Sequence, residues 1–252
     1  MRAFIYLAYD GTNYHGWQIQ PNGMTVQQRL QEALTTLLRK DTEIVGAGRT
    51  DTGVHARLMV AHFDTESAID LDALAHRLNR MLPYDIAIHR IVPVASDAHA
   101  RFSATARTYE YHITTQKDPF ARLRALHFPQ PLDVEAMNAA AEILLTHEDF
   151  TSFSKLHTDV ATNICHVSHA RWQSDAEGKR LVFTITANRF LRNMVRATVG
   201  TLLEVGTHRI SIDQFRSILN QKDRCAAGQS MPAHALYLTG IQYPETIFQT
   251  DL

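Results

Sequence analysis

The order of strand and helix patterns in the first 94 residues most constrains the fold of this chain. Residues 4–9 have the pattern of a strand, and Thr25 and Gln28 have the spacing of a capping box at the start of a helix. A short strand, a longer strand, a helix and an alternating strand follow, at 43–45, near 58–63, after the capping residue Asp70, and at 86–94. This β-α-β-β-α-β order is the ferredoxin-like arrangement.

The second half of the chain repeats the scheme loosely. Its predicted elements are a strand at 108–114, a helix capped by Asp133, strands at 167–173 and 181–187, a long helix from about 190 to a C′ glycine at Gly206, a helix opened by Ser211 and Gln214, and a strand at 236–243. We therefore expect an α+β protein of two related halves, residues 1–104 and 105–252, with a cleft between them.

A loop rich in glycine and threonine encloses a single carboxylate. Its sequence is Gly46-Ala-Gly-Arg49-Thr50-Asp51-Thr52-Gly53-Val54-His55. Glycine is favoured where the backbone needs φ > 0 or approaches another group closely, so this run predicts a shaped loop with Asp51 as a candidate catalytic group. The alternative is structural, because Asp and Thr in loops commonly form turns and Arg49 with Asp51 would make a weak surface ion pair.

The composition describes a soluble globular protein. Hydrophobic residues make up 45% and charged residues 20% of the 252 residues, and no run of eighteen apolar residues occurs. The apolar stretch at the N-terminus is too short for a signal peptide, and two cysteines imply no disulfide framework. We expect a cytoplasmic protein.

The histidines and cysteines do not predict a metal site. Fourteen histidines are present, and the densest group is Cys165, His166 and His169. A second pair of ligands at zinc-like spacing is absent from the sequence, so no bound metal is expected.

The positive charges are unevenly distributed, although the formal net charge is −1. Arg189, Arg192 and Arg196 stand in a stretch without an acidic residue, and cations outnumber acids over residues 101–124. Phosphate binding requires only a local basic face, so the net charge does not exclude an RNA partner. The three arginines have the i, i+3, i+7 spacing of one helix face.

Three segments together carry a specific pattern: Gly48-Arg-Thr-Asp-Thr-Gly-Val-His-Ala56, Ala100-Arg-Phe-Ser-Ala-Thr-Ala-Arg-Thr-Tyr-Glu-Tyr111 and Phe190-Leu-Arg-Asn-Met-Val-Arg196. In this order they resemble the tRNA pseudouridine synthase A family, and the resemblance extends over essentially the whole chain. It implies isomerisation of uridine to pseudouridine at positions 38, 39 and 40 of the tRNA anticodon stem-loop. It also implies a homodimer, no cofactor, and two ferredoxin-like halves whose antiparallel sheets join into one extended sheet.

The chemistry explains the residue types. Pseudouridine forms when the N1–C1′ bond breaks, the uracil turns and C5 joins C1′. A carboxylate serves this reaction as a nucleophile at the sugar or the ring, or as a stabiliser of positive charge at C1′. Asp51 matches the catalytic position of the family. Arg196 matches the arginine that pairs with this Asp. Arg49 is the second candidate for that cation, and we expect it to contact the RNA backbone instead.

The target nucleotide has to leave its stack before it can react. Tyr109 matches the family tyrosine that stacks on the uridine, and by the period of two it shares a strand face with Tyr111. Whether Tyr109 also removes the C5 proton stays open. Further RNA contacts are expected from Arg101, Phe102, Arg189, Arg192 and Trp17.

Two other functions compete with this interpretation. A non-catalytic RNA-binding module would use Tyr109, Phe102 and the arginines, but would leave Asp51 without a role. A phosphate-handling enzyme is disfavoured because the chain has no Gly-x-x-x-x-Gly-Lys-Ser/Thr pattern.

Overall fold

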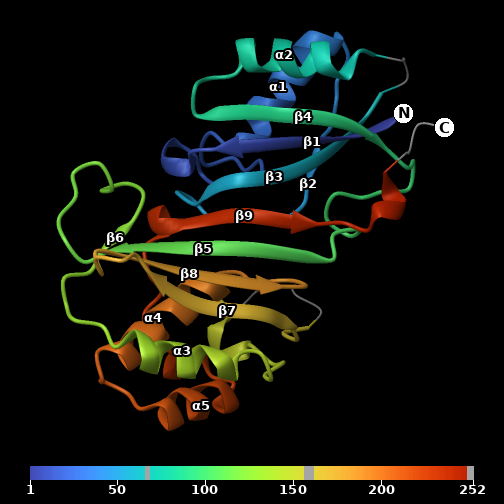
Figure 1. Ribbon diagram of the computed structural model, residues 1–252. Coiled ribbons are helices and arrows are strands. Elements are labelled where there is room, and N and C mark those ends of the chain that lie inside the picture. Colours follow the sequence, from blue (N-terminus) through green and yellow to red (C-terminus); the bar gives the residue numbers. More distant parts are fainter. Residues whose placement is uncertain (66–68, 156–161, 249–252) are drawn as a thin grey trace. The chain divides into compact units, whose positions relative to one another are not determined.

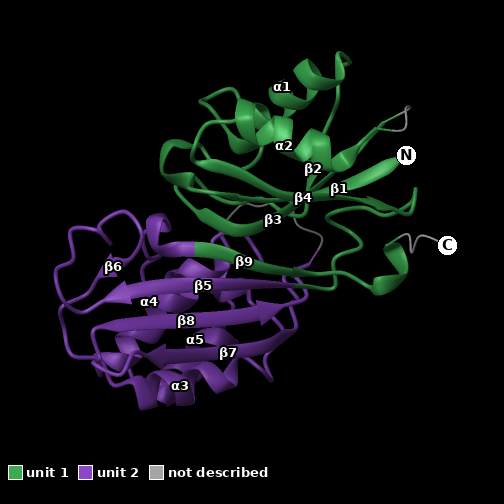
Figure 2. Ribbon diagram, turned by 45° about the horizontal axis from the view of Figure 1, so that its top comes forward, with its two compact units in different colours: residues 1–106, 237–252 green, residues 107–236 purple. Residues whose placement is uncertain are grey.

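A division between residues 106 and 107 separates two units of the chain in the computed structural model (Figure 2). The structure describes residues 1–65, 69–155 and 162–248. Unit 1 comprises residues 1–106 and 237–252, and unit 2 comprises residues 107–236. The division lies close to the expected one at 104 and 105, but the closing strand groups with unit 1 and not with the second half.

Unit 1 has the predicted β-α-β-β-α-β order (Figure 1). Its elements are β1 (Arg2–Tyr9), α1 (Val26–Leu38), β2 (Val45–Gly46), β3 (His55–Asp64), α2 (Leu71–Met81), β4 (Ile86–Val94) and most of β9 (Leu236–Gln242). β1 lies between β4 and β3 and is antiparallel to both, while β2 pairs antiparallel with β3. α2 packs on β4 and α1 packs on α2.

The helices of unit 1 begin at the residues that the sequence indicates. Asp70 Oδ1 accepts a hydrogen bond from Ala73 N at 2.9 Å, and Thr25 Oγ1 accepts one from Gln28 N at 3.3 Å. The second bond of the predicted capping box is replaced, because the Gln28 side chain donates to Glu32 Oε1 at 3.0 Å. Each cap satisfies a backbone donor that the helix itself cannot pair.

Unit 2 contains paired strands and, among its described residues, three α-helices. Its elements are β5 (Ala106–Thr114), β6 (Leu126–His127), α3 (Val134–Ile143), β7 (Val167–Ser174), β8 (Arg180–Ala187), α4 (Met194–Gly206) and α5 (Ile212–Gln221). α3 packs on β7 and contacts the other two helices. β8 is antiparallel to β5 and to β7. The capping box of Ser211 and Gln214 has both of its bonds. Among the helices of the described residues, none is long and apolar enough to cross a membrane.

The strand pairing is mixed, which corrects the expectation of antiparallel sheets. β9 pairs with β3 in parallel, and β6 pairs with β5 in parallel. A parallel pair needs a long crossover between its strands. The chain supplies one, because it passes through all of unit 2 between the end of β3 and the start of β9.

The helix predicted from residue 190 begins later. α4 starts at Met194, directly after Asn193, whose φ of 69° places it in the left-handed region. Arg189 and Arg192 therefore precede the helix, and the predicted arginine face is wrong. Leu191 is buried like the first helical residues. Because Leu191 is apolar and buried without being helical, the apolar spacing in the sequence predicted a helix that begins before the true start of α4.

The end of α4 also differs from the prediction. Gly206 is the last helical residue and not a C′ residue, and the left-handed conformation falls at His208 with φ 56°. A Cβ atom at Gly206 would lie 2.5 Å from Met137 Sδ on α3. The glycine therefore serves close packing between α3 and α4, which contact one another.

Gly200 in the middle of α4 provides a test of such packing. A Cβ atom there would overlap the backbone carbonyl of Gln229. Gly200→Ala should lower the free energy of unfolding by about 1–3 kcal/mol, despite the usual gain from alanine in a helix, since overpacking displaces backbone. Denaturant titration measures the change.

Gly206→Ala is the matched control, because its new methyl group meets the movable side chains of Met137 and Leu132. We expect a smaller loss for it. An unchanged or raised stability of Gly200→Ala would contradict the close approach of α4 to residue 229.

Candidate active site

Asp51 lies in the turn that leads from β2 into β3. Its side chain is half-buried, and that of Arg49 is exposed. The Asp51 carbonyl oxygen accepts a hydrogen bond from Val54 N at 3.1 Å, and Gly53 within this turn has φ 80°. An L-residue with a side chain rarely adopts that φ, so Gly53 allows the tight turn that presents the carboxylate.

A second loop, residues 10–24, packs against the backbone of this turn at Thr50. Gly16, at φ 83°, brings its backbone so close that a Cβ atom would overlap the carbonyl oxygen of Thr50. Trp17 N donates to that carbonyl at 3.3 Å, and Tyr9 OH lies 2.9 Å from Thr50 Oγ1. The backbone beside Asp51 is thus fixed by contacts from residues far away in the sequence.

The aromatic residues of this second loop face the protein interior. Trp17 is 2% exposed, and its indole occupies the space beside Gly46. Tyr14 is 4% exposed and donates its hydroxyl to Asp85 Oδ1 at 2.6 Å, and burial raises its pKa above the usual value. The expectation that Trp17 contacts RNA is therefore wrong, because no indole face is left for a base.

His55 at the start of β3 anchors the turn from its other end. The imidazole is 2% exposed, and its Nδ1 accepts a hydrogen bond from Gly11 N at 3.0 Å. The ring stacks on Tyr237 of β9 at 4.7 Å, and Arg57 Cζ lies 5.2 Å from the centre of the same tyrosine. Sequence reasoning missed this anchor, since nothing in the local pattern pairs residue 55 with residue 237.

Tyr109 stands on β5 in unit 2. It is half-buried, and its ring meets Phe190 edge-on at 5.1 Å. Tyr111, two residues further on, is fully buried and donates its hydroxyl to Pro232 O at 2.9 Å. Burial raises the pKa of Tyr111, and the positive charge of Arg196 opposes the rise. The two tyrosines thus differ: Tyr111 belongs to the core and Tyr109 keeps an accessible part.

Arg196 lies in the first turn of α4 and is half-buried. Its Nε donates to Met231 O at 2.6 Å, and its own carbonyl oxygen accepts from Met231 N at 3.1 Å. The guanidinium is therefore oriented by the segment before β9. Sequence reasoning missed Met231 as its partner, because no local pattern pairs residues 35 positions apart.

Arg189 and Arg192 lie between β8 and α4. Arg189 is half-buried and Arg192 is exposed. Burial raises the pKa of the nearby Cys165 thiol to about 11, and the charge of Arg189 opposes the rise. That thiol is protonated at neutral pH. Within the part of the chain that the structure describes, no three His, Cys, Asp or Glu side chains form a group suited to a metal ion.

Arg101 and Phe102 lie on a tightly held segment before β5. Both are exposed, Phe102 to 75%, and Arg101 Cζ lies 5.5 Å from the centre of the Phe102 ring. His99 Nδ1 accepts hydrogen bonds from the backbone N of Arg101 at 3.1 Å and of Phe102 at 3.3 Å. His62 Nδ1 accepts one from Ala100 N at 3.1 Å. Two neutral imidazoles therefore cap this segment.

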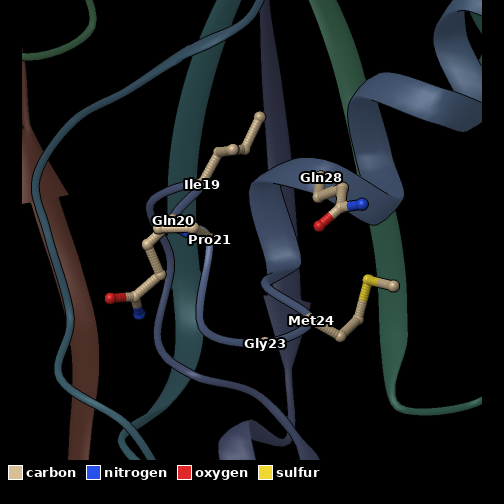
Figure 3. A pocket seen from close by; sticks show the side chains of 6 residues that line it. All are labelled: Ile19, Gln20, Pro21, Gly23, Met24 and Gln28. Carbon is tan, nitrogen blue, oxygen red and sulfur yellow. The ribbon is translucent and has the colours of Figure 1, made fainter.

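One hollow of about 600 Å³ lies beside the start of α1 (Figure 3). The residues that line it are Ile19, Gln20, Pro21, Gly23, Met24 and Gln28. None of them is acidic or basic, and none is a candidate site residue. The hollow therefore supplies no carboxylate nucleophile and no cation to stabilise one.

Comparison with known sequences identifies the class of protein. The sequence model of one family, described as tRNA pseudouridine synthase, matches residues 5–103 and 140–244, which include Asp51 in unit 1 and Arg196 in unit 2. The chain belongs to this tRNA pseudouridine synthase family, whose members are isomerases.

Individual relatives agree with this family. The tRNA pseudouridine synthase A of Parabacteroides distasonis is 61% identical over 251 residues, covering 99% of each chain. That of Bacteroides thetaiotaomicron is 59% identical over 99% of this chain and 93% of its own. The Bacillus subtilis protein of the same name is 41% identical over 96% of this chain and 99% of its own.

The capped segment at residues 99–102 predicts a pH dependence of stability. Burial, with the charges of His99 and Arg2, lowers the pKa of His62 to about 4 from 6.5. The unfolded chain then binds more protons than the folded protein between these values. The contribution of His62 to stability should be constant well above pH 6.5 and should fall by on the order of 2 kcal/mol on acidification to pH 4.

Urea unfolding at several pH values between 7 and 4 measures the slope of the free energy of unfolding against pH. His62→Asn keeps an acceptor near the Nδ1 position and removes one of two titrating imidazoles. It should reduce the slope of stability against pH, and the part that remains belongs to His99, whose pKa burial also lowers. Asp64, whose pKa is lowered by its hydrogen bonds with Arg2, loses its contribution to stability as the pH falls through its unfolded value of 3.8, and this loss is common to the variant and the parent. An equal slope in the variant and the parent would assign the acid sensitivity to other groups.

Proposed function

We propose that this protein is a tRNA pseudouridine synthase that converts uridine to pseudouridine at positions 38, 39 and 40 of the anticodon stem-loop. The observation that carries the proposal is the match over 99% of both chains to the tRNA pseudouridine synthase A of Parabacteroides distasonis. The half-buried carboxylate on a glycine-shaped turn gives the proposal its chemistry.

In this proposal Asp51 is the nucleophile. An ionised carboxylate attacks C1′ or the uracil ring and holds one fragment of the nucleotide while the base turns. Support comes from the turn itself, because the backbone contacts of Thr50 and Gly53 fix the main chain on both sides of Asp51. A nucleophile fixed in this way loses little entropy on reaction.

Tyr109, Arg196 and Arg49 act on the substrate. Tyr109 stacks on the extruded uridine, which suits a half-buried ring held edge-on by Phe190. Arg196 pairs with Asp51 and keeps it charged in a site from which substrate displaces water. Arg49, exposed beside Asp51, contacts the RNA backbone.

Further RNA contacts come from Arg101, Phe102, Arg189 and Arg192. The exposure of Arg101, Phe102 and Arg192 supports this assignment, and the ordered cap of residues 99–102 reduces the entropy lost on binding. Arg189 is less accessible and contributes mainly through its charge.

The proposal also covers the fold of each unit, the oligomeric state, the cellular location and the cofactor requirement. Each unit is a ferredoxin-like half, the two sheets join into one extended sheet, and a central cleft receives the tRNA. The strand order β4-β1-β3 with β2 on β3 supports this for unit 1. The protein acts as a cytoplasmic homodimer and needs no cofactor, because the reaction is an isomerisation in which a carboxylate supplies the nucleophile.

Mapping pseudouridine in tRNA tests the function directly. The purified protein should introduce pseudouridine into an unmodified tRNA that carries uridines at 38 to 40, and Asp51→Asn should produce none. The amide retains the shape of the carboxylate and removes its charge, so turnover should fall by at least about 10³-fold, comparable to the loss of a principal catalytic group.

Asp51→Asn should melt within a few degrees of the parent and bind tRNA with similar affinity. Those two measurements separate lost chemistry from lost folding. Retained turnover in this variant would exclude Asp51 as the nucleophile, and tRNA binding without modification by the parent would favour the RNA-binding module.

Arg196 variants test the role of its charge. Arg196→Lys keeps the cation but not the Nε bond to Met231 O, whereas Arg196→Met loses both. If the charge supports Asp51, kcat should fall by about 10-fold for Arg196→Lys and by about 10²–10³-fold for Arg196→Met, with tRNA affinity nearly unchanged. Parallel losses of kcat and affinity would instead identify Arg196 as a contact to the RNA backbone.

A further inference from the structure

The connection between β5 and β6, residues 115–125, presents an aromatic ring to solvent. We call it the β5–β6 loop, and Figure 1 shows it in green, projecting from the end of the unit 2 sheet. Phe120 is 93% exposed, and Leu123 is 43% exposed. Single exposed apolar side chains are common on protein surfaces, so the exposure of Phe120 matters only together with the order and the charge of the loop around it.

The loop is ordered by its own hydrogen bonds. Asp118 accepts from Phe120 N at 2.9 Å through Oδ1 and from Ala121 N at 3.1 Å through its carbonyl oxygen. The Ala121 carbonyl accepts from Arg124 N at 2.8 Å and from Ala125 N at 2.9 Å. Two consecutive turns thus hold Phe120 outward before any partner binds, and a preordered contact loses less entropy on association.

The charge of the loop is positive. Lys117, Arg122 and Arg124 are exposed, and Asp118 is the one acidic residue among residues 115–125, all of which the structure describes. The Asp118 carboxylate also lies 3.6 Å from Arg180, at the start of β8. Its charge is therefore offset within the fold, and the side of the loop around Phe120 carries the cations.

An RNA strand fits this combination better than a protein partner. A stable protein interface buries about 800 Å² on each side around an apolar centre that is poor in charge. The loop offers two apolar side chains interrupted by cations. Single-stranded nucleic acid needs the reverse, an aromatic face for a base with cations for the neighbouring phosphates.

We propose that the β5–β6 loop is an RNA-docking surface, at which Phe120 stacks on an unpaired base while Lys117, Arg122 and Arg124 contact phosphates. The RNA is a tRNA if the proposed function holds, and the inference rests on that function for the identity of the RNA. Tyr109 lies six residues before the loop on β5, which corresponds to about 20 Å along a strand. The loop therefore contacts the tRNA away from the reacting uridine and acts on binding and not on chemistry.

Two variants and a matched control test the proposal. Lys117→Gln/Arg122→Gln should weaken tRNA binding and reduce the slope of log K against log salt by about 1.4–1.8, the contribution of two phosphate contacts. Phe120→Ser should weaken binding by about 5–100-fold with an unchanged slope, because it removes stacking and no charge. In both variants KM for tRNA should rise and kcat should stay at the parental value.

The control is Arg209→Gln/Arg216→Gln, which removes the same charge from exposed positions of unit 2 near and on α5. It should leave the affinity and the salt slope unchanged. Thermal melting verifies folding, and no loss is expected, since the side chains replaced in the loop are exposed.

The outcomes separate this inference from the proposed function. Parental affinity in both loop variants, with normal pseudouridine formation, would overturn the docking surface alone. Loop-dependent tRNA binding by a parent that forms no pseudouridine would leave the docking surface standing and refute the function. A fall in molecular mass by light scattering for Phe120→Ser, with unchanged tRNA binding, would assign the loop to contact between protein copies and overturn the proposal.

Discussion

The close approach of two backbone segments in unit 1 is the constraint on which the candidate catalytic group depends. Side chains at Gly11 and Gly16 would overlap the carbonyl oxygens of Val54 and Thr50, respectively. At these two points the loop before α1 and the turn before β3 therefore approach each other backbone to backbone. The main chain that carries Asp51 is therefore fixed close to both of these contact points, which limits the positions that its carboxylate can take.

This arrangement shows what the sequence reveals and what it hides. The density of glycine around Asp51 predicts a shaped turn, and Gly53 adopts the positive φ that such a turn requires. Gly16 and Trp17, which support the turn, are more than thirty residues away, and their pairing with Thr50 is tertiary. Trp17 in a polar loop resembles a binding residue, whereas its burial against Gly46 makes it part of the framework.

The fold was predictable wherever local chemistry decides the structure. Asp70, Asp133 and Ser211 cap helices as their side chains predict, because the bond they form is within four residues of the cap. α4 was predicted poorly for the opposite reason. Leu191 is buried whether or not it is helical, so apolar spacing alone does not locate the helix start that Asn193 sets through its left-handed conformation.

The two units hold their candidate site residues in place by different contacts. In unit 1 the backbone itself fixes Asp51, whereas in unit 2 a long side chain has to be fixed. The segment around residues 228–231 does this, because it lies against Gly200 of α4 and offers the Met231 carbonyl to Arg196. Without a side chain at Gly200 the segment approaches α4 closely enough for a 2.6 Å bond to Nε. The packing of α4 at Gly200 and the orientation of the Arg196 guanidinium are therefore coupled. A substitution at Gly200 that displaces residues 228–231 would also move the carbonyl group that binds Arg196.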